Sequence, residues 1–307
     1  MNRRKFLQST TIAAVSAASL TGAADKPAAP ATRQRPHLKK GLMYNSFRGA
    51  TADRLSVRQK FELARDAGFD GIEIRAAMNQ AEVLGARDAT GLAIPSVTGA
   101  VHWVKPLSDP NPSVRETGLE SLKQGLRDAK AYGASSVLLV PAVVSKDVSY
   151  ADAWQRSVAE ITKAIPLAES LGVAIAIENV WNQFLLSPLE AATYIDSFKS
   201  PMVRWHFDVG NVVNQGWPEQ WIRVLGLRIA KVHVKEYSRQ LRDSKGPRAG
   251  FDVELMEGDS DWPAVMRALD DVSYTGWMIT EQRRPPGLDD RGYLAHLSAK
   301  LDAIFAV

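Results

Sequence analysis

The chain contains no cysteine among its 307 residues, which excludes disulfides, thiolate metal sites and cysteine nucleophiles. Any metal site must therefore use oxygen and imidazole ligands. Histidine is also scarce, at five residues, so a centre built from many imidazoles is not expected. Apart from a short and weakly apolar stretch near the N-terminus, no segment approaches the length of a membrane span. We therefore expect no stable membrane anchor.

The chain as a whole has no excess of acidic residues, but residues 41–307, the body of the chain, have one. The formal net charge is +4, yet the first 40 residues carry +7, which leaves −3 for residues 41–307. The body thus lacks the basic surface that a phosphate backbone requires. We expect no nucleic-acid partner.

The N-terminus is typical of an export signal. Arg3 and Arg4 are followed by Phe6 and Leu7, and then by a weakly apolar stretch that ends in small residues near Ala24. A basic head, a short apolar middle and a small-residue end form the layout of a secretory signal. The arginine pair resembles a twin-arginine signal. The alternatives are an ordinary basic N-terminus and an uncleaved anchor.

These features predict a twin-arginine-type signal peptide over residues 1–24 and a Pro/Ala-rich tether over residues 25–40. The remaining residues, 41–307, are predicted to form one catalytic domain. The expected location is the periplasm or another exported compartment.

From residue 41 the sequence alternates short apolar runs with helical periods. Eight strands are expected, at Leu42–Phe47, Gly71–Arg75, Ile94–Gly99, Ser136–Pro141, Val173–Asn179, Val203–Val209, Ile229–Lys235 and Trp277–Glu281. The helical stretches between them are Ser56–Ala67, Val114–Tyr132, Asp152–Leu171, Pro188–Phe198, Pro218–Leu225, Trp262–Leu269 and Asp290–Ile304. Three of the helices stop at a glycine directly before a strand: Gly68, Gly133 and Gly172.

Eight strand–helix units predict a single-domain (β/α)₈ TIM barrel. The fourth and fifth strands are continuous apolar runs, as in parallel strands that are covered on both faces. The rival is an open, doubly wound sheet, but no Gly-x-Gly-x-x-Gly turn follows the first strand. We therefore predict the barrel.

Metal-compatible side chains stand at the ends of four consecutive strands. These residues are Glu178, Asp208, His233 and Glu281. Taken singly, each has an ordinary structural explanation: a salt-bridged glutamate, a turn aspartate or a hydrogen-bonded core histidine. In a barrel, however, the carboxyl ends of all strands meet at one rim, where catalytic residues lie. Three carboxylates and one imidazole suit Mn²⁺ or Mg²⁺, with Zn²⁺ and Co²⁺ as alternatives.

Several motifs carry a family resemblance. The segment Phe61–Ile74 is similar to the second-strand region of the sugar phosphate isomerase/epimerase family, whose fold is the xylose isomerase-like TIM barrel. Later motifs of that family resemble Ile177–Asn179, Phe207–Asn211, Val232–Glu236 and Glu257–Val265. The family also includes endonuclease-IV-like enzymes, which use three metals and many histidines and match less well.

The resemblance implies specific roles. In the ketose 3-epimerase branch, four residues bind one metal, and they match Glu178, Asp208, His233 and Glu281. An arginine six residues after the histidine holds substrate, and Arg239 stands there. Family members are often dimers or tetramers, so a homo-oligomer fits the resemblance. One departure is that Asn211 stands where the branch often has histidine, which suggests different substrate contacts.

Such a site can make and quench an enediolate. A metal that chelates a carbonyl and a neighbouring hydroxyl polarises the carbonyl, while one glutamate removes a carbon-bound proton and the other returns one. Proton return to the opposite face gives epimerisation, and return to the neighbouring carbon gives isomerisation. On a 3-keto-glycoside the same residues could expel the glycosidic oxygen. The sequence does not distinguish which of Glu178 and Glu281 is the base.

Other residues are candidate substrate contacts near the strand ends: His102, Lys235, Trp181, Arg283 and Asn211. His206 lies one layer below Asp208 and is either a core polar residue or part of the site. The leading function is a metal-dependent isomerase or epimerase acting on a small, non-phosphorylated carbohydrate. The alternatives are a 3-keto-glycoside lyase that uses the same residues and a non-catalytic sugar-binding barrel.

Overall fold

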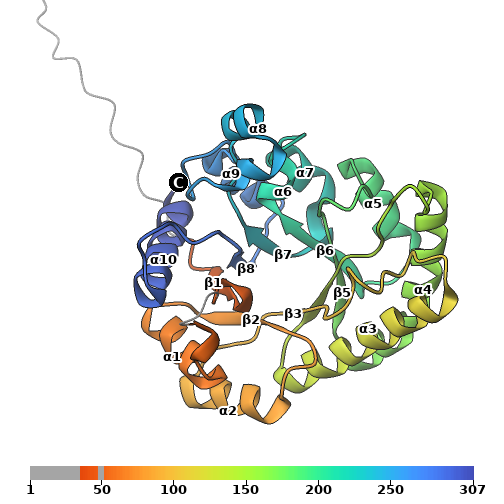
Figure 1. Cartoon of the computed structure of the whole chain (residues 1–307), viewed down its shortest axis with the longest axis horizontal. Helices are drawn as coiled ribbons and strands as arrows, with labels where there is room; N and C mark the ends of the chain where they lie inside the picture. The colour runs from red at the N-terminus through yellow and green to blue at the C-terminus, as the bar shows by residue number, and fades with distance from the viewer. Residues whose placement is uncertain (1–34, 48–51) are drawn as a thin grey trace, which may run out of the picture. The chain divides into compact units, whose positions relative to one another are not determined.

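Eight parallel strands close into a barrel in a computed structural model that describes residues 35–47 and 52–307 (Figure 1). The strands are β1 (Leu38–Met43), β2 (Gly71–Arg75), β3 (Val97–Thr98), β4 (Ser136–Leu139), β5 (Ala174–Glu178), β6 (Val203–Asp208), β7 (Ile229–Val234) and β8 (Gly276–Thr280). They pair in sequence order, and β8 pairs with β1 to close the barrel. The predicted single-domain (β/α)₈ TIM barrel is confirmed, and the open sheet is excluded.

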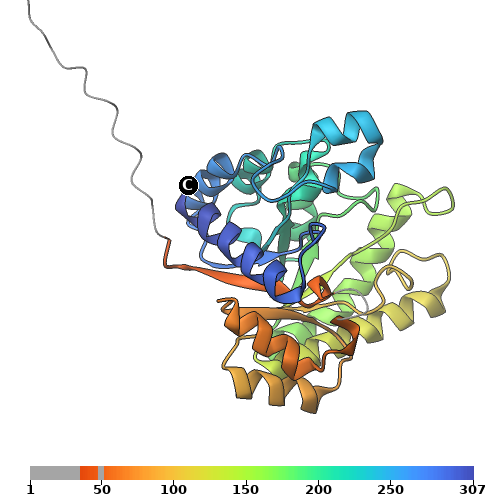
Figure 2. The same ribbon diagram turned by 60° about the vertical axis from the view of Figure 1, so that its left-hand side comes forward.

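The helices form a ring outside the strands, as the two views of the ribbon show (Figures 1 and 2). They are α1 (Val57–Asp66), α2 (Gln80–Thr90), α3 (Pro112–Tyr132), α4 (Tyr150–Leu171), α5 (Pro188–Ser197), α6 (Val209–Val213), α7 (Pro218–Leu225), α8 (Arg239–Lys245), α9 (Trp262–Asp271) and α10 (Asp290–Ala306). Helices α2, α6 and α8 were not predicted. Two of them are very short, and α2 carries Gly85 in its interior and buries only Val83 and Ala86.

The start of the barrel differs from the predicted boundary at residue 41. The first strand was predicted at 42–47 but runs from Leu38 to Met43, and a short 3₁₀ turn follows it. The start of this strand was not predicted because Lys39 and Lys40 interrupt the apolar pattern. The ammonium of Lys40 pairs with Asp302 on α10 at 3.0 Å, whereas Lys39 lies over the ring of Trp277, its neighbour on β8, so the two side chains leave β1 on opposite faces.

Arg35 also belongs to the barrel rather than to the predicted tether. It is buried, pairs with Asp270 at 3.0 Å, and donates to the carbonyls of Phe305 and Val307 at the end of α10. The predicted signal peptide and the first part of the tether, residues 1–34, lie outside the described residues. Within the described residues, no helix combines the length and apolar character needed to cross a membrane.

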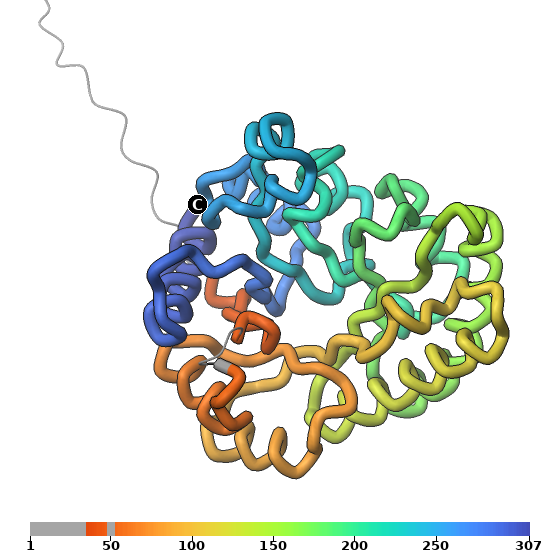
Figure 3. Tube along the Cα trace, viewed as in Figure 1, coloured from red at the N-terminus to blue at the C-terminus, as the bar shows by residue number. Residues whose placement is uncertain are grey.

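The helix stops were predicted correctly. Gly133 and Gly172 follow α3 and α4 with φ of +77° and +66°, a left-handed conformation that glycine adopts without steric cost. The chain then turns directly into β4 and β5, whose side chains are buried throughout. The tube in Figure 3 shows how each strand is followed by a loop that returns the chain to the outer ring. The functional groups described next lie at the ends of the strands and in the loops that follow them.

Candidate metal centre and substrate cavity

Four metal-compatible side chains converge at the carboxyl ends of β5 to β8. Glu178 and Asp208 are the last residues of β5 and β6, His233 lies next to the end of β7, and Glu281 directly follows β8. One ligand atom from each lies within 4.8 Å of the others. The structure thus brings together all four residues that were predicted at the strand ends.

The imidazole of His233 lies at the centre of this group. Its Nδ1 atom is 3.0 Å from Glu178 Oε1, 3.3 Å from Glu281 Oε2 and 3.9 Å from Asp208 Oδ2. Lys235 Nζ lies 2.9 Å from Asp208 Oδ2 and 2.7 Å from Glu281 Oε2. Glu178, Asp208 and His233 are buried, and Glu281 is partly open to the cavity.

Burial sets the electrostatics of the cluster. It raises the pKa of Glu178 to about 7 and also raises the pKa of Asp208, although Lys235 acts against the second shift. For Glu281, burial acts to raise the pKa, but the charges of Lys235 and His233 together lower it below its usual value. The pKa of His233 is raised well above 6.5, because the carboxylates of Glu73, Glu178 and Glu281 outweigh the burial that would lower it.

These residues fit a divalent cation. Three carboxylates and Lys235 leave a net charge of about −2 when His233 is neutral, and a buried charge of that size requires compensation. Oxygen ligands with one imidazole are suitable for a hard divalent metal. The cluster could therefore hold one metal ion through Glu178, Asp208, His233 and Glu281.

The backbone around Asp208 is fixed by neighbouring amides. The Asn179 side chain accepts from the Asp208 amide at 2.9 Å and donates to its carbonyl at 2.7 Å. Asp208 Oδ1 caps α6 by accepting from the Asn211 amide at 2.8 Å, which leaves Oδ2 directed at the cluster. Gly210 is required here because a Cβ atom would lie 2.8 Å from the Lys235 carbonyl oxygen.

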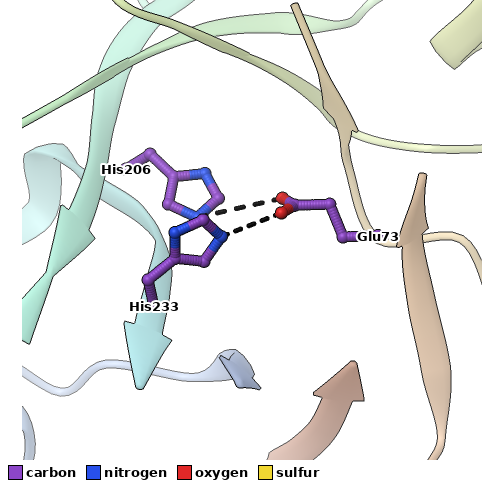
Figure 4. A group of neighbouring side chains, drawn as sticks. All are labelled: Glu73, His206 and His233. Carbon is purple, nitrogen blue, oxygen red and sulfur yellow. Dashed lines mark hydrogen bonds and ion pairs between the residues drawn. The ribbon is translucent and has the colours of Figure 1, made fainter. Parts of the chain in front are cut away.

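Glu73, which was not predicted as a site residue, points towards His233 and His206 (Figure 4). It is buried on β2, and its Oε2 is 2.8 Å from His233 Nε2, while Ser96 donates its hydroxyl proton to Oε1. His206 packs against His233 with ring centres 4.1 Å apart, and its Nε2 is 3.9 Å from Glu73 Oε1. The only sequence signal was a carboxylate in the middle of an apolar strand.

A cavity of about 1000 Å³ opens above the cluster. Both glutamates of the cluster line it, as do five of the predicted contact residues: His102, Trp181, Asn211, Lys235 and Arg283. Further lining residues that were not predicted as contacts include Arg75, Trp103, Arg248 and Phe251. His206 is not among the lining residues and belongs to the layer below.

Arg239, to which the resemblance gives a substrate contact, is not among the residues that line the cavity. Its guanidinium donates to the carbonyls of Val213 at 3.1 Å and Gly216 at 2.8 Å, and it lies over the ring of Trp217. Because Arg239 opens the short helix α8, its side chain is directed back towards the loop after α6. It therefore holds α8 against this loop.

The other predicted contacts are held in place by hydrogen bonds and ion pairs. His102 Nδ1 accepts from the Val140 amide at 3.2 Å, and burial lowers the pKa of its imidazole to about 4, so the ring is neutral near pH 7. Trp181 Nε1 donates to the Asn211 carbonyl at 3.0 Å. Arg283 pairs with Asp252.

The chain belongs to the xylose isomerase-like TIM barrel family, whose model matches residues 61–301. Among curated proteins it is 26% identical to a protein of Escherichia coli (strain K12) provisionally named L-ribulose-5-phosphate 3-epimerase SgbU, over 79% of this chain and 91% of that one. It is 23% identical to the L-ribulose-5-phosphate 3-epimerase UlaE of the same strain, over 73% of this chain and 81% of that one.

Solved structures of sugar epimerases share the fold. The E. coli 3-keto-D-glucoside 4-epimerase YcjR superposes with a TM-score of 0.72 at 17% identity, covering 86% of this chain and 99% of that one. A D-allulose 3-epimerase from Methylomonas sp. gives a TM-score of 0.71 at 19% identity, covering 89% and 99%. These relatives and neighbours are named as sugar epimerases, a kind of isomerase.

Proposed function

We propose that this protein is a divalent-metal-dependent sugar epimerase or isomerase. It removes a proton from the carbon next to a carbonyl, passes through an enediolate and returns the proton. The observation that carries the proposal is the position of Glu178 and Glu281. Both are part of one metal-compatible cluster and both line the same cavity. The names of the relatives agree with this reaction class.

Each residue of the cluster has a distinct task in this proposal. Glu178, Asp208, His233 and Glu281 would hold the metal, which supplies polarisation of the carbonyl and stabilisation of the negative charge beside it. One glutamate accepts the carbon-bound proton and the other donates one, because proton transfer needs both a base and an acid within reach of the substrate. Lys235 lies between Asp208 and Glu281, favours their ionised forms and holds both carboxylates in position.

The substrate is proposed to be a non-phosphorylated carbohydrate, and the enzyme is proposed to act after export. The support for both is the twin-arginine-type sequence around Arg3 and Arg4, since phosphorylated sugars are scarce outside the cytoplasm. Fractionation of cells that express the full chain tests the location. Replacement of Arg3 and Arg4 by lysine should retain the protein in the cytoplasm.

Deuterium incorporation tests the chemistry. Wild-type protein loaded with Mn²⁺ should wash deuterium from D₂O into ketoses or 3-keto-glycosides at the carbon next to the carbonyl. Glu178→Gln and Glu281→Gln should each lower kcat by about 10²–10⁴-fold, whereas the surface control Glu120→Gln should not. Release of an aglycone would instead indicate β-elimination by the same residues. If both glutamine variants exchange at the wild-type rate, the glutamates have no proton-transfer role.

A further inference from the structure

The cavity extends well beyond the metal-compatible cluster. Its two lining carboxylates, Glu178 and Glu281, lie on the side formed by β5 to β8. Among the described residues, the opposite side, formed by the ends of β1 to β4, contributes no carboxylate to the lining. It presents hydrogen-bonding and aromatic groups instead: Asn45, Ser46, Arg75, Thr98, His102 and Trp103. The two sides of the cavity therefore differ in chemistry.

One sugar ring does not fill this space. The cavity volume is about 1000 Å³, at the upper end of the range for small-molecule sites. A hexose has about a dozen non-hydrogen atoms. Even at the volume that a water molecule occupies in the liquid, about 30 Å³, these atoms take no more than roughly 400 Å³. A ring chelated at the cluster would leave most of the β1–β4 side open.

Trp103 provides an aromatic surface on that side. It lies in the loop after β3 and is 49% exposed, although tryptophan is usually well covered. Its only ring contact in the described part of the chain is an edge contact with His102, at 6.2 Å between ring centres. An exposed indole at the wall of a polar cavity is suited to stack on the apolar face of a sugar ring.

The charges on the walls favour a neutral ligand on the β1–β4 side. Of the cavity arginines, Arg283 and Arg284 are already paired with Asp252 and Asp290. Arg75, the last residue of β2, lines the β1–β4 side and is exposed to solvent. Arg248 also lines the cavity and is exposed to solvent. Exposed, scattered guanidinium groups donate well to hydroxyls but do not form the convergent set of donors that holds a phosphate.

We propose that the β1–β4 side of the cavity is a subsite for a second, neutral sugar ring, which stacks on Trp103 and accepts hydrogen bonds from Arg75 and His102. The substrate class is then a two-ring glycoside rather than a free monosaccharide. This proposal rests on the proposed function for the first ring, which reacts at the metal-compatible cluster.

Three probes test the subsite: the 3-keto derivative of a glucose disaccharide, 3-keto-D-glucose, and D-ribulose 5-phosphate. Deuterium exchange gives kcat/KM for each, and calorimetry with the unoxidised disaccharide gives a Kd that does not depend on turnover. The variants are Trp103→Ala and Trp103→Phe. The matched control is Trp217→Ala, because Trp217 is 54% exposed but does not line the cavity.

We expect the disaccharide-to-monosaccharide ratio of kcat/KM to fall about tenfold in Trp103→Ala, mainly through KM, and to recover in Trp103→Phe. The disaccharide Kd should rise by a similar factor, and Trp217→Ala should change neither. An unchanged ratio and Kd in Trp103→Ala, or a preference for the ketose phosphate, would overturn the subsite. If no probe exchanges deuterium, the proposed function is wrong. The disaccharide Kd values of wild type and the variants then test the subsite independently of turnover.

Discussion

The imidazole of His233 lies between two carboxylates that come from different strands of the barrel, Glu73 on β2 and Glu178 on β5. Its Nε2 is 2.8 Å from Glu73 Oε2, and its Nδ1 is 3.0 Å from Glu178 Oε1. A proton on Nε2, donated to Glu73, leaves the lone pair of Nδ1 available to a metal at the cluster. Carboxylates that hold a ligating histidine in this way fix its tautomer and orientation.

Replacement of Glu73 should therefore weaken metal binding. We expect Glu73→Ala to lower the affinity for Mn²⁺ by about 10–100-fold, as measured by calorimetry on the metal-free protein. Glu73→Gln, whose amide oxygen can still accept from His233 Nε2, should retain most of the affinity. Circular dichroism of each variant checks the fold, and Glu62→Gln on the surface is the control. Equal affinities in Glu73→Ala and wild type would remove this role.

Metal binding should also depend on pH. Burial raises the pKa of Glu178 to about 7, and the surrounding carboxylates raise that of His233 well above 6.5, so both groups are protonated in slightly acidic solution. A metal ion must displace these protons, and its affinity must fall as the pH falls. Titrations with Mn²⁺ between pH 5.5 and 8.5 should show tightening of up to about tenfold per pH unit for each proton released. A flat profile would contradict the assigned protonation.

The convergence of the four strand-end residues could be predicted because parallel strands bring their carboxyl ends to one rim. Glu178 ends an apolar run, and Asp208 and Glu281 end or directly follow strands that the alternating pattern predicts. Glu73 could not be assigned in this way. Its partner, His233, lies 160 positions away, and only closure of the barrel between β8 and β1 brings β2 near β7.

The local sequence did not indicate the start of the first strand or the direction of the Arg239 side chain. Lys39 and Lys40 are typical of a charged linker, but they belong to β1, where Lys40 pairs with Asp302 and Lys39 lies over Trp277. Arg239 follows His233 at the spacing implied by the resemblance, yet a short helix turns its guanidinium onto backbone carbonyls. The direction of a side chain in a loop depends on tertiary contacts, which spacing does not encode.

His102 should make the protein less stable in acid. Burial lowers its pKa from 6.5 to about 4 in the folded state, so the unfolded chain binds a proton more readily between these values. The free energy of unfolding should therefore fall by up to about 3 kcal/mol as the pH falls from 6.5 to 4. His102→Asn, which preserves an acceptor for the Val140 amide, should show a smaller decline in urea denaturation. The pKa of His206 is also lowered, so His206 still destabilises the His102→Asn variant in acid, and only the difference between the two proteins is due to His102.

Lys235 should couple stability to metal binding. Its ammonium lies between Asp208 and Glu281, and removal leaves buried carboxylates without a counter-charge. We expect Lys235→Met to destabilise the metal-free protein by about 3 kcal/mol. Added Mn²⁺ should then raise the Tm of this variant more than that of wild type, because the ion supplies the missing charge and binds only the folded state. Lys123→Met, at an exposed ion pair with Glu120, is the control. Equal Mn²⁺-induced shifts in Tm for Lys235→Met and wild type would show that the ammonium and the metal do not share these carboxylates.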